Sequence, residues 1–144
     1  MLVHQNLKGK AAQGIVTVAS SITVGKAARI LSEKRIGTAL VSDDGKTADG
    51  ILSERDIVVN LARAGSNCLD GKVGDYMTRK LVTCTMQTSA QELLQKMTKG
   101  RFRHVPVMDG DTVIGLVSLG DVVKAQLSEL EMEKEALEGM IMGH

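Results

Sequence analysis

The chain repeats itself at an offset of 66 residues. The segment Ile15–Val18 aligns with Leu81–Cys84, and after a one-residue slip Gly50–Ser53 aligns with Gly115–Ser118. A repeated segment of this kind is one structural unit that buries its apolar face against its neighbour. The 144 residues hold two such units, and a unit of about 60 residues is only marginally stable alone. We therefore expect two similar units packed together.

Each copy carries the same amphipathic helix. Apolar residues at i, i+3, i+4 and i+7, the pattern of one helix face, occur at matching places. In the first copy they are Val24, Ala27, Ala28 and Leu31, and in the second they are Ala90, Leu93, Leu94 and Met97. A short strand precedes this helix, and two strands joined by a tight turn follow it before a second helix. Each unit is thus predicted to have the order β-α-β-β-α.

The second copy has clear local boundaries. Ser89 and Glu92 have the Ser-x-x-Glu spacing of a capping box, and Gly100 suits the end of the helix. Pro106 falls inside the strand that follows. Because proline cannot donate a backbone hydrogen bond, we expect this strand to lie at a sheet edge or to be bulged at Pro106. Such an edge leaves space for a ligand.

Composition narrows the class of partner. Aromatic residues make up 1% of the chain, so it has no platform for stacking bases, and a formal net charge of +1 is not the basic footprint of nucleic-acid binding. No apolar run is long enough to span a membrane. Cys68 and Cys84 show no Cys-x-x-Cys spacing, and the chain has no signal-like start. We expect a cytoplasmic protein that contacts neither nucleic acid nor membrane.

Catalytic and metal-binding patterns are missing from the sequence. The histidines, at positions 4, 104 and 144, are scattered, and no His/Cys pair has zinc-ligand spacing. The segment Gly115–Gly120 superficially suggests a phosphate loop, but Asp121 stands where the lysine of such a loop must be. An enzyme would need an acid–base pair, for which His104 with Asp121 or Glu54 is the candidate. We predict no catalytic residue and no metal, and binding explains the sequence better.

Four motifs carry a family resemblance. They are the Arg-Phe-Arg-His-Val-Pro-Val segment at 101–107, Gly-Leu-Val-Ser-Leu-Gly-Asp at 115–121, Gly-Ile-Leu-Ser-Glu-Arg-Asp at 50–56 and Val-Gly-Asp-Tyr-Met-Thr at 73–78. Over roughly residues 8–127 the chain resembles a tandem of cystathionine-β-synthase (CBS) domains, a stand-alone Bateman module. The resemblance implies an α/β (α+β) fold in which two pseudo-symmetric β-α-β-β-α units pack face to face through their sheets.

The predicted organisation has five parts. They are an N-terminal arm (1–13), a first CBS domain (14–66), a linker (67–79), a second CBS domain (80–127) and a helical extension (128–144). In the last helix, apolar residues at 123, 127, 130, 137 and 141 follow a heptad-like spacing with Lys134 at the missing position. Two interpretations stay open, a helix that covers the module's own core and a contact between two subunits.

The resemblance also implies a ligand and its residues. In CBS pairs an adenosine ligand lies between the units, so we expect a small-molecule nucleotide here, AMP first, with ADP, ATP or NAD(H) as alternatives. Carried over, one site would comprise Ser118, Asp121 and Val82, and the other Ser53, Asp56 and Val16. Arg103 and His104 would clamp phosphate, assisted by Arg101 and Arg55, because arginine forks chelate phosphate oxygens. Ligand contacts are also predicted at Thr38 and Pro106.

Simpler roles compete with these assignments. Asp56 and Asp121 each follow a serine at a helix start, where an aspartate often serves only as a cap. Thr38 stands in the place of His104 and Gly37 in that of Arg103, so the two sites are unequal, and we expect one to dominate.

Two functions follow. The first is a regulatory or sensor module, expected as a homodimer, that changes conformation with nucleotide and acts on a protein partner. The alternative is a non-catalytic dimerisation or interaction module whose clefts are vestigial.

Overall fold

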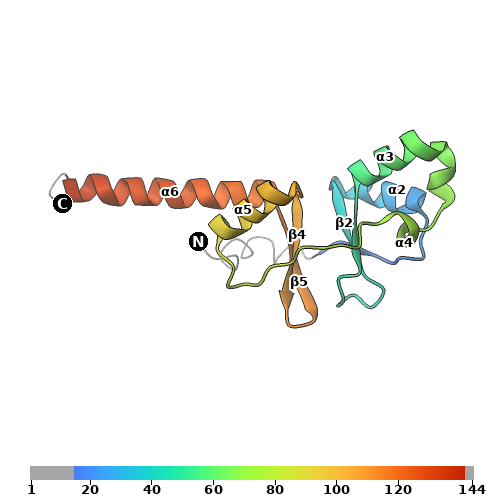
Figure 1. Cartoon of the computed structure of the whole chain (residues 1–144), viewed down its shortest axis with the longest axis horizontal. Helices are drawn as coiled ribbons and strands as arrows, with labels where there is room; N and C mark the ends of the chain where they lie inside the picture. The colour runs from blue at the N-terminus through green and yellow to red at the C-terminus, as the bar shows by residue number, and fades with distance from the viewer. Residues whose placement is uncertain (1–14, 142–144) are drawn as a thin grey trace.

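The structure is a computed structural model that describes residues 15–141. The predicted arm at 1–13 and the end of the predicted extension lie outside the described residues. Two units lie side by side, and one helix projects from the second (Figure 1).

The first unit is a three-stranded sheet covered by two helices. Strands β1 and β2 are parallel, and β2 and β3 are antiparallel, in the order β1-β2-β3. The elements are β1 (Thr17–Val18), α2 (Val24–Lys34), β2 (Thr38–Val41), β3 (Gly50–Ser53) and α3 (Glu54–Ala64). This is the predicted β-α-β-β-α order.

The second unit repeats that order with one strand reduced. Its sheet consists of β4 (His104–Asp109) and β5 (Thr112–Ser118), which are antiparallel, with helices α5 (Ala90–Gly100) and α6 (Leu119–Ile141). The strand predicted at 81–84 is only an isolated bridge between Cys84 and Val107.

Pro106 gives a physical reason for the missing strand. In the first unit the Leu40 N–H donates to the Val16 carbonyl at 3.1 Å. Pro106 stands at the position of Leu40 and has no N–H, so the Val82 carbonyl cannot receive the equivalent bond. The segment at 81–84 pairs with β4 through Cys84, whose N–H donates to the Pro106 carbonyl at 3.0 Å. The bulge expected at Pro106 lies one residue further on, between Val107 and Met108.

The connection between the units packs on the first one. It contains the 3-10 helix η1 (Gly65–Asp70) and the short helix α4 (Val73–Tyr76). The Val24 N–H donates to the Gly71 carbonyl at 2.9 Å, and Thr78 and Ile51 exchange two backbone hydrogen bonds of 2.8 and 3.0 Å. The connection therefore extends the edge of β3 before the chain enters the second unit.

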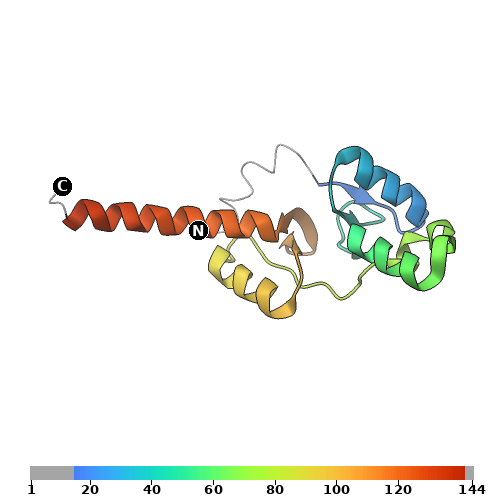
Figure 2. The ribbon, with the colours of Figure 1, turned by 90° about the horizontal axis from the view of Figure 1, so that it is seen from above.

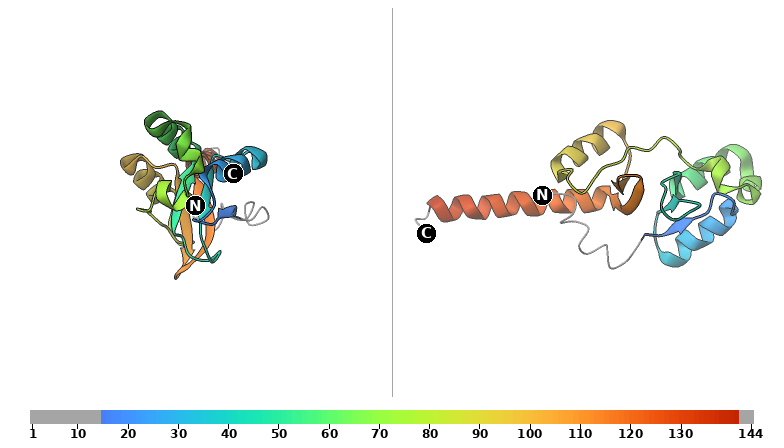
Figure 3. Two further views of the ribbon diagram at one scale, coloured as in Figure 1. Left: turned by 90° about the vertical axis from the view of Figure 1, so that its right-hand side faces the viewer. Right: turned by 90° about the horizontal axis from the view of Figure 1, so that it is seen from below.

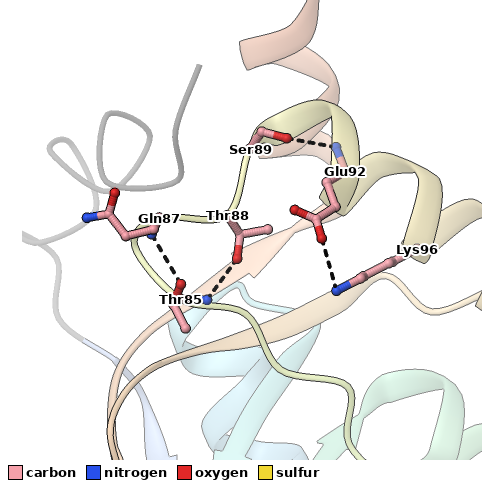
Figure 4. A network of polar contacts seen from close by, with 6 residues as sticks. All are labelled: Thr85, Gln87, Thr88, Ser89, Glu92 and Lys96. Atoms are coloured by element: carbon pink, nitrogen blue, oxygen red, sulfur yellow. Dashed lines mark hydrogen bonds and ion pairs between the residues drawn. The ribbon is translucent and has the colours of Figure 1, made fainter.

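Helix ends follow the repeat. Thr23 caps α2 and Ser89 caps α5 by accepting a backbone N–H three residues on. Figure 4 shows the Ser89–Glu92 bond, and the Glu92 carboxylate lies 3.5 Å from the Lys96 ammonium one turn later. Both helices end in a left-handed arginine, Arg35 and Arg101. Gly100, expected at the end of this helix, is its last helical residue.

The two sheets meet through a shared apolar cluster. Each unit has its own core, and a third cluster joins Leu40 of β2 and Ile51 of β3 to Val113 of β5. The Val113 N–H also donates to the Lys46 carbonyl at 2.7 Å. The prediction that the units pack face to face through their sheets is confirmed.

Helix α6 extends far beyond the second unit. Figures 2 and 3 show it projecting away from both sheets. Near its start Val122 and Ala125 are buried, whereas every residue from 130 to 138 is exposed. Within residues 15–141, no helix is both long and apolar enough to cross a membrane.

Candidate functional site

A cleft of about 530 Å³ lies between the units. A cavity of this size is typical of a small-molecule site. The first unit contributes residues from the start of α3 and from the ends of β2 and β3, and the second contributes the segments before its strands. The lining residues are Gly37, Thr38, Ile51, Ser53, Glu54, Arg55, Asp56, Thr78, Lys80, Leu81, Val82, Arg101, Phe102, Arg103 and His104.

The charge of the cleft is positive. Among the described residues that line it are four cationic side chains, against the two carboxylates of Glu54 and Asp56. The cations are Arg55, Lys80, Arg101 and Arg103. Arginine in particular offers paired N–H donors that match the oxygens of a phosphate. The cleft is therefore suited to an anionic ligand with a polar, uncharged part.

The start of α3 supplies the polar wall. Ser53 and Asp56 form a capping box, in which the Ser53 N–H donates to Asp56 Oδ2 at 2.9 Å and the Asp56 N–H donates to Ser53 Oγ at 3.1 Å. The simpler capping role is thus real for Asp56. It does not exclude a ligand role, because the same bonds hold the half-buried carboxylate at the rim of the cleft.

The opposite wall comes from the turn between α5 and β4. Arg101 has left-handed backbone, with φ of 57°, and ends α5. The Arg103 carbonyl accepts the Leu119 N–H at 2.7 Å, which ties this turn to the start of α6. The side chains of Arg101 and Arg103 are exposed, so they can reach a ligand without leaving a buried position.

Thr38 and His104 meet across the interface of the units. Thr38 Oγ1 lies 3.1 Å from His104 Nδ1, and the two residues are separated by 66 positions, the offset of the repeat. Equivalent positions of the two copies therefore face each other at the back of the cleft. When the hydroxyl donates, Nδ1 is the acceptor of a neutral imidazole; when the imidazole is charged, Nδ1–H donates instead.

The structure groups the predicted residues differently from the sequence analysis. Val82 lies in the cleft with Ser53 and Asp56, not with Ser118 and Asp121 as expected. Arg55, Thr38 and the Arg101–His104 turn line the same cleft. Val82 thus lines the cleft beside the start of α3, whereas Ser118 lines a different cavity. The grouping of these residues around a ligand stays a prediction.

The remaining predicted residues lie elsewhere. Ser118 and Asp121 form a second capping box, at the start of α6, with the Ser118 N–H donating to Asp121 Oδ2 at 3.0 Å. Ser118 lines another cavity, of about 780 Å³, together with Arg103, His104 and the first turns of α6. Val16 and the buried Pro106 are backbone partners in their sheets and are not among the residues lining the cleft.

Sequence reasoning missed several lining residues. Lys80 and Leu81 precede Val82, and their place next to a predicted adenine contact was a usable signal. Glu54 lies against Gly37, where an added Cβ would be 3.2 Å from its Oε1, and only the folded structure brings these two residues together. Within residues 15–141 no group of three or more His, Cys, Asp or Glu side chains could hold a metal ion.

Comparisons with known proteins agree with this architecture. The CBS domain family model matches residues 11–63 and 73–128. The "CBS domain-containing protein CBSX3, mitochondrial" of Arabidopsis thaliana is 36% identical over 94% of this chain and 68% of its own length. The chain also matches longer relatives such as CBSCBSPB5 of the same plant, of which it spans 22%.

Solved structures give the same result. The crystal structure of the CBS-domain containing protein ATU1752 from Agrobacterium tumefaciens has a TM-score of 0.81 and 39% identity, covering 88% of this chain and 99% of that one. PAE2072 from Pyrobaculum aerophilum, complexed with AMP, has a TM-score of 0.77 and 25% identity over 92% and 99% of the two chains. The MJ0100 pair, in complex with 5-methylthioadenosine and S-adenosyl-L-methionine, has a TM-score of 0.74 and 27% identity over 87% and 98%. The chain belongs to the CBS-domain family and carries a pair of CBS domains.

Proposed function

We propose that this CBS pair binds an adenosine nucleotide in the cleft between its units and acts as a regulatory module rather than as an enzyme. One observation carries the proposal: the Ser53–Asp56 helix start of one unit faces the Arg101–Arg103 turn of the other across one cavity. Two similar CBS structures hold AMP, or methylthioadenosine and S-adenosylmethionine, which supports an adenosine ligand.

Each part of the nucleotide has a matching wall. The adenine lies against Ile51, Leu81 and the backbone of Val82, whose carbonyl has no N–H from Pro106 to accept and is suited to the adenine amino group. Asp56 accepts the ribose hydroxyls. Arg103 and Arg101 chelate the phosphate, with Arg55 and Lys80 adding positive charge.

The charge of the cleft selects among adenosine ligands. S-adenosylmethionine has no phosphate and carries a cationic sulfonium, so the four cationic side chains repel its sulfonium, whereas they attract the phosphate of AMP. We place AMP first, with ADP, ATP and NAD(H) behind it because the cleft volume of about 530 Å³ favours the smallest phosphate ligand.

A second site, formed by Ser118, Asp121 and Val16, is the weaker of the two. Its phosphate wall would come from the first unit, where Gly37 and Thr38 replace Arg103 and His104. Without an equivalent of Arg103, this site keeps only Arg35, in the place of Arg101, as a forked donor for phosphate.

The mechanism follows from the location of the cleft. A ligand that contacts both units stabilises the arrangement in which both walls reach it, and this differential affinity shifts the population toward that arrangement. Such a module would act on a protein partner that binds one arrangement better than the other.

Calorimetric titration tests the site. We expect AMP to bind saturably with one dominant site per chain, and S-adenosylmethionine to bind more weakly. Arg103→Gln removes a charged hydrogen bond to phosphate and should weaken AMP binding by about tenfold or more. Asp56→Asn should also weaken it, whereas Asp121→Asn, which alters the matching capping box outside the cleft, should not.

Two results would overturn the proposal. They are no heat with AMP, ATP, NADH or S-adenosylmethionine from a folded protein, or weakening by Asp121→Asn with no effect of Asp56→Asn. The first of these results would favour the second candidate function, an interaction module with vestigial clefts. The observation in favour of that function is the exposed apolar side of α6.

A further inference from the structure

Helix α6 has two apolar faces, and only one of them is covered. Val122 and Ala125 pack in the core of the second unit. The other face is a stripe of large apolar side chains that are 38 to 83% exposed, namely Val123, Leu127, Leu130, Leu137 and Ile141. At about 100° per residue, these five side chains lie within about 80° of the helix circumference. The centre of this arc is about 100° or more away from the buried Val122 and Ala125. We call them the α6 stripe.

The α6 stripe needs a partner surface. The helix projects beyond both units in Figures 1 and 2 and in the right-hand view of Figure 3, so no part of the described chain covers its far half. An exposed apolar stripe on a surface helix is typical of an interaction site. Because an isolated helix gains little stability from its backbone alone, packing of this stripe is what would hold the projecting turns.

The charges beside the stripe decide what can cover it. Lys124, Glu131 and Glu138 follow one another at heptad spacing along one flank, and Glu133 lies on the other. In a parallel pair of α6 helices, Glu133 would face Glu138 of the partner subunit, and the pair would repel. In an antiparallel pair like flanks meet, so Lys124 faces the partner's Glu138 at both ends, and only the central Glu131 and Glu133 face their own counterparts. The two attractive pairs then match the two repulsive ones in number, whereas a parallel pair has only repulsive ones.

We propose that the α6 stripe pairs antiparallel with α6 of a second copy of this chain. In this register Leu127 lies beside the partner's Leu137 and Val123 beside the partner's Ile141, an overlap of about 27 Å at 1.5 Å per residue. Lys134, the residue that interrupts the stripe, lies 3.9 Å from Glu138 of its own helix. In the pair it would also lie near the two-fold axis, close to the Glu131 carboxylates, and offset their repulsion.

The cavity at the base of α6 receives the end of the partner helix. This cavity, of about 780 Å³, is lined by the apolar Val123 and Leu127, by the cationic Arg103 and Lys124, and by one carboxylate, that of Glu131. The last turns of α6 carry Glu135 and Glu138 beside Leu137 and Ile141, so they bring both apolar side chains and negative charge to a basic, apolar groove. The inference is independent of nucleotide binding.

Charge reversal tests the pairing. Sedimentation of the full chain should show a dimer, and Lys124→Glu or Glu138→Lys alone should raise its dissociation constant by on the order of tenfold, because each pair occurs twice in a two-fold dimer. The double variant should dimerise more tightly than either single variant, although it still lacks the Lys134–Glu138 ion pair within the helix. Circular dichroism of each variant separates lost pairing from lost folding.

Cysteine cross-linking tests the direction. Leu127→Cys mixed with Leu137→Cys should form a disulfide between the two variants, whereas neither variant alone should do so; the natural Cys68 and Cys84 are buried. A cross-link within the Leu127→Cys variant alone would indicate a parallel pair and overturn the inference. A monomeric wild-type chain that instead binds a lysine-rich amphipathic peptide would also overturn the inference. A dimer whose dissociation constant changes with neither charge reversal would do the same.

Discussion

Pro106 affects the second sheet because it has no backbone N–H to donate. Its counterpart Leu40 donates to Val16 and closes the first strand of its sheet, whereas at Pro106 the same edge stays open beside the candidate cleft. One residue thus makes the two units unequal at the place where an adenine would bind. The amino-acid type, rather than the topology, sets this difference.

Replacing Pro106 should close that edge. Pro106→Ala supplies an N–H that can donate to the Val82 carbonyl, and a net backbone hydrogen bond is worth about 1 kcal/mol. We expect a similar or higher Tm and an AMP affinity about threefold to tenfold weaker, because the carbonyl is no longer open to the adenine. Thermal unfolding and calorimetric titration of the same variant measure both effects. An unchanged affinity would mean that the Val82 carbonyl does not contact the ligand.

At the scale of elements, the turn between β2 and β3 is held by one carboxylate. Asp44 accepts hydrogen bonds from the Thr47 N–H at 2.7 Å, from the Lys46 N–H at 2.8 Å and from the hydroxyls of Thr47 and Ser42. These bonds, first of all the one from the Thr47 backbone, hold the pKa of Asp44 well below its usual range. The ionised form is therefore what organises the turn.

This turn should give the stability a dependence on pH. Because the folded-state pKa is lowered, the contribution of Asp44 is fully present above about pH 4 and is lost as the pH falls below that value. Asp44→Asn should lower the Tm at pH 7, and the difference from wild type should narrow between pH 4 and pH 2. Asp111→Asn, in the corresponding turn between β4 and β5, is the matched control. A difference that stays constant down to pH 2 would contradict this account.

The repeat predicted most of the elements because helix periodicity and capping residues are local signals. The helix after Ser89 and its partner after Thr23 occur where the spacing of apolar residues indicated. The strand at 81–84 was predicted from its match to Ile15–Val18, but its pairing depends on a donor in another strand, which Pro106 lacks. The grouping of Val82 with Asp56 could not be predicted either, since a repeat shows which residues are equivalent and not which halves of the two units face each other.

At the scale of the whole molecule, one turn separates two cavities. Arg103 and His104 line both the cleft between the units and the cavity at the base of α6. The same guanidinium therefore lies within reach of a nucleotide phosphate on one side and, in the proposed dimer, of the partner's acidic helix end on the other. Two anions that compete for one arginine are thermodynamically linked.

This shared arginine makes dimerisation sensitive to nucleotide. A phosphate in the cleft should draw Arg103 away from the partner helix, so saturating AMP should raise the dimer dissociation constant several-fold, and by reciprocity dimerisation should weaken AMP binding by the same factor. Sedimentation with and without AMP measures the effect. Adenosine, which has no phosphate, is the control ligand, and in Arg103→Gln the difference should vanish. Equal dimerisation with and without AMP, in a chain that binds AMP, would show that the two cavities act separately.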